Sequence, residues 1–176
     1  MSSNCLKRDR SPAESGPRSL LCVFLLVVAI LIAGICWYGN QLVISVIPED
    51  NLQKYIFPTH IGDEWYYTYI HSVQRTPCDE YFTIKGVDDM VMTHTVYQSY
   101  GVGLPCYPDD GKFTLTKDGH FILEMNRPMK NVALRTQPIP QQRLFINGQE
   151  LKLYQIYPSG TLVKVEVTKR YQVWFQ

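Results

Sequence analysis

A charge-free apolar stretch near the N-terminus constrains this chain more than any other feature. No charged residue occurs between Ser19 and Pro48, and the strongly apolar part is the 19 residues from Leu20 to Tyr38. As a helix, with a rise of about 1.5 Å per residue, this part would span roughly 28 Å, close to the hydrocarbon thickness of a bilayer. The stretch therefore predicts a helix that crosses a membrane once.

Three other interpretations of this stretch are weaker. A cleavable signal peptide has a shorter apolar core and small residues at its exit, whereas the exit here reads Ile-Cys-Trp-Tyr-Gly at 35–39. A lipoprotein needs a small residue before the modified cysteine, but Leu21 precedes Cys22 and Ile35 precedes Cys36. A buried helix of a soluble protein is the third. We favour an anchor that stays attached.

The charges that flank the stretch predict its orientation. Residues 1–18 hold four basic and two acidic residues, and the first basic residue after the stretch is Lys54. Because basic residues concentrate on the cytoplasmic side, the N-terminus is expected in the cytoplasm. We expect a disordered tail (1–18), an anchor in the cytoplasmic membrane (19–39) and an extracytoplasmic domain (40–176), with Trp37 and Tyr38 at the outer interface. The formal net charge of +1 argues against a nucleic-acid partner.

The rest of the chain has the pattern of an all-β domain. Trp65, Tyr67 and Tyr69 alternate with other residues at period two, which is typical of a half-buried strand. Turn signals such as Asn147-Gly148 separate similar short segments, and no segment outside the anchor keeps a helical period. The pattern predicts an antiparallel sandwich or barrel-like fold of about eight or nine strands. Ten segments are candidates for these strands: 41–47, 52–57, 64–71, 80–85, 90–98, 112–116, 120–124, 144–146, 150–154 and 162–167.

Two cysteines belong to the predicted extracytoplasmic domain. Cys78 and Cys106 can form a disulfide in an oxidising compartment, or both stay reduced. Zinc binding by these cysteines with His71 and His94 is possible by residue type, but no closely spaced pair of ligands supports it. Asp109-Asp110-Gly111 lacks the further oxygen ligands of a calcium loop and is better read as a turn. We therefore expect no metal and no cofactor.

A first group of candidate functional residues lies at the expected end of the 64–71 strand. It comprises His71, Ser72, Thr76 and Glu80. Adjacent strand residues point to opposite faces, so His71 is poorly placed to activate Ser72 as a nucleophile, and we favour turn-forming roles for both. Glu80 can approach His71 across a tight turn, which would make either a local ion pair or a ligand site.

A second group is the glycine-rich segment of Gly101, Gly103, Leu104 and Pro105. No helix is expected after it, so it is not a dinucleotide-binding loop. Two glycines and a proline instead indicate an unusual backbone path or the close approach of another segment. Each group has a cysteine beside it, so we expect the two groups to meet in space and to form one patch that contacts a partner or ligand.

Tyr69-Ile70-His71-Ser72-Val73, with Thr76, Glu80 and Gly101–Pro105, resembles a bacterial family of domains of unknown function, family "eighteen-fifty". The resemblance extends from about Gln41 to the C-terminus. The family commonly has Glu-Lys after the Ser-Val pair, whereas this chain has Gln74-Arg75. Such proteins are typically encoded beside TRAP transporters that use TAXI-type solute receptors, so the resemblance implies a role in solute uptake.

The sequence thus predicts a membrane-anchored accessory or binding module whose partner is a TRAP permease or a TAXI-type solute receptor. A stand-alone domain that binds a small ligand or a metal ion is the alternative. A hydrolase-like enzyme is a weaker third, because the residues form no catalytic signature that requires it.

Overall fold

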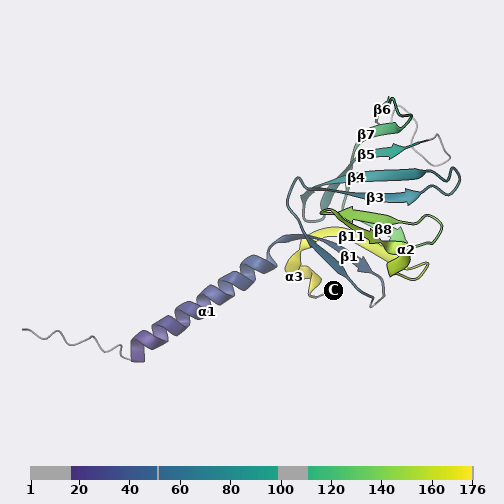
Figure 1. Ribbon diagram of the computed structural model, residues 1–176. Coiled ribbons are helices and arrows are strands. Elements are labelled where there is room, and N and C mark those ends of the chain that lie inside the picture. Colours follow the sequence, from purple (N-terminus) through teal and green to yellow (C-terminus); the bar gives the residue numbers. More distant parts are fainter. Residues whose placement is uncertain (1–16, 51, 99–110, 176) are drawn as a thin grey trace, which may run out of the picture. The chain divides into compact units, whose positions relative to one another are not determined.

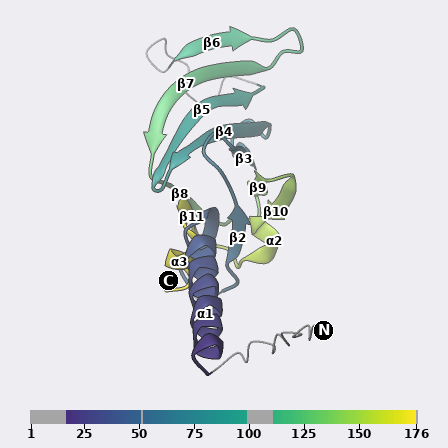
Figure 2. The same cartoon turned by 90° about the vertical axis from the view of Figure 1, so that its left-hand side faces the viewer.

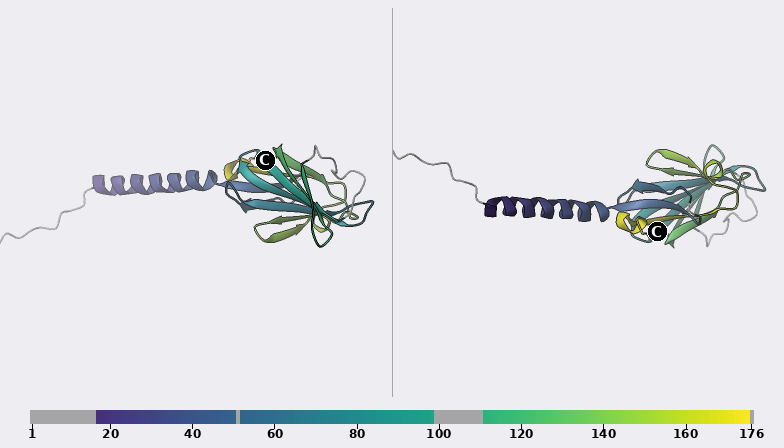
Figure 3. Two further views of the ribbon diagram at one scale, coloured as in Figure 1. Left: turned by 90° about the horizontal axis from the view of Figure 1, so that it is seen from above. Right: turned by 90° about the horizontal axis from the view of Figure 1, so that it is seen from below.

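The computed structural model describes residues 17–50, 52–98 and 111–175. The chain divides into two units, residues 1–38 and 39–176. In the first unit, α1 (Pro17–Gly39, whose last residue belongs to the second unit) is one uninterrupted helix (Figures 1 and 3). Within its segment Leu20–Gly39, an 18-residue window has a mean hydropathy of 3.1 and contains no buried residue. Its length and composition suit a membrane anchor or a signal sequence.

The second unit is built almost entirely from strands, as predicted. Among the described residues, its only helices are two single turns, one between β10 and β11 and one after β11. The elements are β1 (Leu42–Pro48), β2 (Tyr55–Pro58), β3 (Glu64–Ile70), β4 (Pro77–Gly86), β5 (Asp89–Tyr97), β6 (Lys112–Leu115), β7 (Phe121–Met129), β8 (Asn131–Arg135), β9 (Arg143–Ile146), β10 (Gln149–Lys152), α2 (Leu153–Ile156), β11 (Leu162–Lys169) and α3 (Arg170–Val173).

These strands form two antiparallel sheets. A four-stranded sheet has the order β2-β1-β11-β8, and a seven-stranded sheet has the order β10-β9-β3-β4-β5-β7-β6. Figure 2 shows the larger sheet curving from β6 at the top towards β10, with β8, β11 and β2 below β4 and β5. The sheets form an open sandwich, so of the two predicted architectures the sandwich is confirmed and a closed barrel is not.

Period-two alternation places the core between the sheets. Trp65 and Tyr67 of β3 point inward and are 1% and 6% exposed, while Tyr66 between them points to the opposite face and is half-buried. Ile44 and Val46 of β1 and the alternate valines of β11 face them from the smaller sheet. The buried residues of the main cluster are Ile44, Val46, Phe57, Trp65, Tyr67, Phe82, Ile84, Met90, Met92, Val132, Leu144, Ile146, Leu151, Leu153, Tyr157, Val163, Val165 and Val167.

Two of the predicted hairpins are confirmed by backbone geometry. Asn147 and Gly148 have φ of 52° and 73° between β9 and β10, as a two-residue turn with left-handed residues requires. Gly119, with φ of 81°, closes the β6–β7 turn, where the backbone N–H of Thr116 donates to His120.

The strand count exceeds the predicted eight or nine, because the described residues form eleven strands. β8 was not predicted, and β7 runs five residues past the expected end at Glu124. Arg127, Pro128 and Met129 pair with Met92, Val91 and Met90 of β5. A proline in this stretch argues against a strand from sequence alone. Here Pro128 lies near the end of β7, beyond the residues that β6 pairs with.

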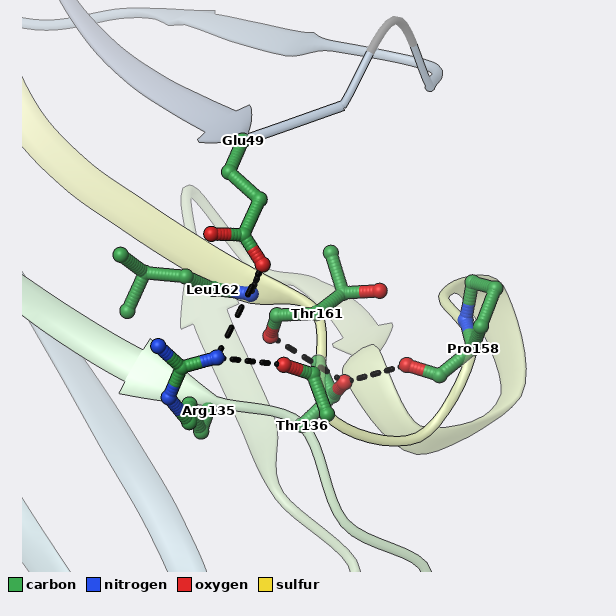
Figure 4. A network of polar contacts seen from close by, with 7 residues as sticks. Glu49, Arg135, Thr136, Pro158, Thr161 and Leu162 are labelled. Carbon is green, nitrogen blue, oxygen red and sulfur yellow. Dashed lines mark hydrogen bonds and ion pairs between the residues drawn. The ribbon is translucent and has the colours of Figure 1, made fainter.

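A polar network closes one end of the smaller sheet (Figure 4). The Glu49 carboxylate accepts a hydrogen bond from the Leu162 N–H at 2.9 Å and lies 3.8 Å from the Arg135 guanidinium. Arg135 also donates to the Gly160 carbonyl, and the Thr136 hydroxyl donates to the Pro158 carbonyl. These contacts join β1, β8 and β11 at the end of the sheet opposite Leu42 and Lys169, which pair at the other end.

Candidate functional site

His71 shapes the turn between β3 and β4. It is 9% exposed, its N–H donates to the Thr76 carbonyl at 2.9 Å, and its carbonyl accepts the Arg75 N–H at 2.8 Å. Its ring Nδ1 accepts the backbone N–H groups of Val73 and Gln74, each at 3.3 Å. This geometry requires the ring proton to be on Nε2, so His71 acts as a cap for the turn, with Ser72 exposed beside it.

Glu80 lies inside β4 rather than at the turn. It pairs with Tyr67 and Thr95 on the neighbouring strands, and the Tyr69 hydroxyl donates to its Oε1 at 3.4 Å. In the described part of the chain, no ion pair joins Glu80 to His71. The structure therefore places these two candidate residues in different settings, a turn and a sheet interior.

The remaining candidates, Gly101, Gly103, Leu104 and Pro105, lie outside the described residues, as does Cys106. The meeting of the two groups and a Cys78–Cys106 disulfide therefore stay predictions. Cys78 has no disulfide partner among the described residues, is 1% exposed, and its sulfur lies 3.7 Å from the Thr95 hydroxyl.

Tyr69, Cys78 and Glu80 form a small polar cluster within the sandwich. Burial is the largest cause that raises the pKa of all three groups, so the phenol and the thiol are held neutral. The hydrogen bond from Tyr69 and the positive charge of Arg127 act in the opposite direction on the pKa of Glu80. A thiol with a raised pKa is a poor nucleophile, so these groups are arranged for interior hydrogen bonding.

Glu80→Gln is expected to stabilise the fold at neutral pH. The folded pKa of Glu80 is raised above 4.5 by burial, so the folded state binds more protons than the unfolded state just above that pH. The stability of the natural chain therefore falls as pH rises through the folded pKa, and the glutamine variant lacks this fall. Urea unfolding of the full chain in detergent, on both sides of pH 4.5, measures the difference.

Asp63→Asn supplies a control of opposite sign. The N–H of His60 donates to the Asp63 carboxylate at 2.8 Å and lowers the pKa of that group below 3.8. Its stabilising contribution is present above pH 3.8 and is lost as pH falls. The asparagine variant should therefore be less stable than the natural chain at neutral pH. Equal effects of the two substitutions would contradict the assignment of Glu80 as a desolvated carboxyl.

The outer face of the seven-stranded sheet carries an arrangement that sequence reasoning missed. One residue from each strand lies in a single register row across the whole sheet. We call it the outer row, and its members, in spatial order, are Glu150, Phe145, Tyr66, Tyr81, His94, Glu124 and Lys112.

Four rings in the centre of the outer row are stacked on one another. The ring centroids lie 4.5 Å apart for Phe145–Tyr66, 5.0 Å for Tyr66–Tyr81 and 4.2 Å for Tyr81–His94, and the planes deviate from parallel by 7° to 25°. Tyr66 and Tyr81 are each stacked between two rings, so they present ring edges and hydroxyls to solvent. All four side chains are half-buried.

Charged groups complete the outer row at both ends. Glu150 accepts a hydrogen bond from Arg143 at 3.2 Å at one end, and Lys112 donates to Glu124 at 3.4 Å at the other. The pKa values of Tyr66 and Tyr81 are raised, first by burial and then by the nearby negative charge of Asp79. Both phenols therefore stay protonated and available as hydrogen-bond donors at physiological pH.

No group of side chains that could hold a metal ion lies on this face in the described residues. Nowhere in the described ranges do three or more His, Cys, Asp or Glu side chains form a group that could hold a metal ion. A small open pocket lies instead at the β4–β5 turn and the β7–β8 junction, lined by Asp88, Asp89, Pro128, Met129 and Lys130. This pocket shares no lining residue with the outer row.

One of three comparisons with known proteins matches this part of the chain. The family model for DUF1850, a domain of unknown function, matches residues 66–153. That range runs from the third residue of β3 to the first residue of α2, so it contains nearly all of the seven-stranded sheet but leaves out β1, β2 and β11. No curated protein and no solved structure matches the chain. The chain, which carries an N-terminal apolar helix ahead of this domain, belongs to the DUF1850 family.

Proposed function

We propose that this chain is a membrane-anchored, extracytoplasmic accessory module that works by binding another protein rather than by catalysis. The observation that carries the proposal is the outer row, in which four stacked rings cross the sheet that the family model matches. Tyrosine and other aromatic residues are enriched in protein interfaces, because they bury a large area and lose little conformational entropy.

The geometry of the rings favours a protein partner over a small ligand. A sugar or a nucleobase stacks on an open ring face. The rings of Tyr66 and Tyr81, however, are each covered by a neighbouring ring on both faces. The ring edges, tyrosine hydroxyls and flanking ion pairs form a broad surface with a central aromatic part and a charged rim. This is the usual anatomy of a protein contact.

The partner follows from the family resemblance. The family is typically encoded beside TRAP transporters, so the permease or its TAXI-type receptor is the partner that we propose. An anchor at 19–39, with the domain outside the cytoplasmic membrane, would place the outer row in the compartment where such a receptor delivers solute to the permease. The basic residues before the anchor support this orientation.

The alternative, a stand-alone small-ligand domain, has one observation in its favour. The open pocket between Asp88 and Lys130 has a volume of about 270 Å³. Drug-sized ligands usually occupy mainly apolar pockets of about 300–1,000 Å³. Two aspartates and a lysine around a small, open pocket fit such a ligand less well than the outer row fits a protein.

Capture from native membranes tests the proposal. The full chain, tagged after Gln176, is expected to retain the permease or the receptor, and Tyr66→Ser/Tyr81→Ser is expected to reduce the retained partner by about tenfold or more. The reason is that a central aromatic contact commonly contributes about 2 kcal/mol, and about 1.4 kcal/mol corresponds to tenfold in affinity.

Ile61→Ser/Val73→Ser is the matched control, because both side chains are exposed apolar groups outside the outer row (67% and 64%). Thermal melting verifies that each variant is folded. Equal retention by both double variants, or no transporter component with any of them, would contradict the proposed contact. In the same cells, protease added to spheroplasts should cut the domain and leave residues 1–18 protected. A fully protected domain would disprove the orientation.

A further inference from the structure

Aromatic side chains are exposed in the segment after β11. Tyr171 is 42% exposed, Trp174 is 53% exposed and Phe175 is 85% exposed, although the other aromatic residues of the second unit are mostly buried or half-buried within the described ranges. Such rings normally find cover in a folded protein, because leaving a large apolar side chain in water forgoes about 1.5–3 kcal/mol. A cluster of exposed rings therefore suggests a contact outside this unit.

Backbone and side-chain contacts fix this segment beside the residues where the unit begins. The Arg170 N–H donates to the Gln41 carbonyl at 2.9 Å, and the Lys169 ammonium donates to the Asn40 carbonyl at 2.8 Å. A methyl group on Gly39 would lie 3.4 Å from the Tyr171 Cβ and 3.6 Å from the Trp174 ring. Tyr171 and Trp174 therefore lie next to Gly39.

Chain connectivity places this position at the end of the apolar helix. Gly39 follows Trp37 and Tyr38 directly, and it is the last residue of α1. If the helix crosses the bilayer, as the proposed function holds, Gly39 must lie at or near the outer membrane surface. The exposed rings that pack beside Gly39 are then held at the same level.

We propose that the segment Tyr171–Phe175 inserts into the outer interface of the bilayer and forms a second membrane attachment of the domain. This inference rests on the anchoring that is part of the proposed function. Tryptophan and tyrosine are enriched at the boundary between headgroups and acyl chains, where an apolar ring and a polar group are both accommodated. Lys169 and Arg170 lie directly before the rings, and basic groups there are attracted to anionic lipids.

A second attachment would restrict how the domain can tilt. A single helix followed by a short connection leaves an attached domain free to swing, whereas two contacts with the surface hold it in one orientation. The Lys169 end of β11 would then face the membrane. The opposite end, where Leu162 pairs with Arg135, would point away from it.

Tryptophan emission in reconstituted vesicles tests the proposal. The chain has three tryptophans, and Trp65 is 1% exposed in the core. The full chain is placed in phosphatidylcholine and phosphatidylglycerol vesicles, with or without lipids brominated near the headgroup end of their acyl chains. The emission of Trp174 is obtained by subtracting the emission spectrum of Trp37→Phe/Trp174→Phe from that of Trp37→Phe. We expect this emission to be lost in the brominated vesicles and shifted to the blue in unbrominated ones.

Ile139→Trp in the Trp37→Phe/Trp174→Phe background is the matched control. Ile139 is 75% exposed, and it follows Arg135 at the opposite end of the smaller sheet, so a tryptophan there should keep its emission. Quenching of Trp37 in the Trp174→Phe variant reports the anchor separately. If Trp37 is quenched and Trp174 is not, the anchor stands and the second attachment is wrong.

Two further outcomes are decisive. If Trp37 is not quenched either, the helix is not a membrane anchor, and the proposed function fails together with this inference. If Trp174 is unquenched in lipid vesicles but protected from acrylamide in native membranes, a protein covers the segment and the lipid contact is overturned.

Discussion

Replacement of Trp65 by alanine is expected to reduce the free energy of unfolding by about 3–5 kcal/mol, the usual cost of truncating a fully buried large aromatic residue. Trp65 is 1% exposed, stacks on Phe82 across β3 and β4 with ring centroids 4.4 Å apart, and pairs with Ile146 on its other side. A domain of this size is stable by about 5–15 kcal/mol. The change is therefore large enough to leave a considerable unfolded fraction.

Urea unfolding followed by circular dichroism measures this loss of stability. Two further variants serve as controls. Trp174→Ala makes the same chemical change at a half-exposed position, and it should cost no more than about 1 kcal/mol. Trp65→Phe should cost much less than Trp65→Ala. It keeps a ring on Phe82, and it removes an indole N–H that is buried without a hydrogen-bond acceptor among the described residues. Similar losses for Trp65→Ala and Trp174→Ala would show that the sandwich core lies elsewhere.

Gly111→Ala is expected to detach the edge strand β6. Gly111 has φ of 148°, and a methyl group on it would collide with the carbonyl oxygen of Glu124 on β7. Backbone cannot move aside as a flexible side chain can, so the strand pairing must yield, at a cost of about 2 kcal/mol or more. Hydrogen exchange of the amides in β6 and β7 should become much faster in the variant.

Gly119→Ala separates backbone strain from steric collision. Gly119 also has a positive φ, 81°, but an added methyl group would meet nothing within 4 Å. Its substitution should cost about 1–2 kcal/mol from the left-handed conformation alone. Unchanged exchange in β6 of the Gly111 variant would contradict the close approach to Glu124.

The parts of the fold that local patterns determine were predictable. The alternation of Trp65 and Tyr67 identified a strand and its inner face, and Asn147-Gly148 identified a hairpin, because both signals act over a few residues. The apolar run from Leu20 identified the helix in the same way. β8 was not predicted, because Asn131–Arg135 is short and follows Pro128, a residue that argues against a strand.

The outer row was beyond local reasoning. Its rings come from four strands, and β9 pairs with β3, although Phe145 and Tyr66 are far apart in the sequence. A register irregularity between Tyr81 and Phe82 also decides that His94, rather than Thr93, stands opposite Tyr81. The abundance of tyrosine was a signal that the fold uses many rings, but only the register shows which of them stack. His71 and Ser72 stand out in the sequence as a polar pair at a strand end, and the structure places them in a turn that the His71 ring caps.

The central place of β11 in the smaller sheet has a consequence for biosynthesis. β11 lies between β1 and β8, and the Ser45–Glu166 hydrogen bond joins residues 121 positions apart. A ribosome releases β1 long before it releases β11, so the strand that follows the apolar helix must wait with one edge open until Leu162–Lys169 has emerged. Pairings this distant slow folding, because a long loop must close first. A nascent chain stalled before β11 would thus be a target for chaperones and proteases. Pairing of β11 with β1 would cover the open edge and end this exposure.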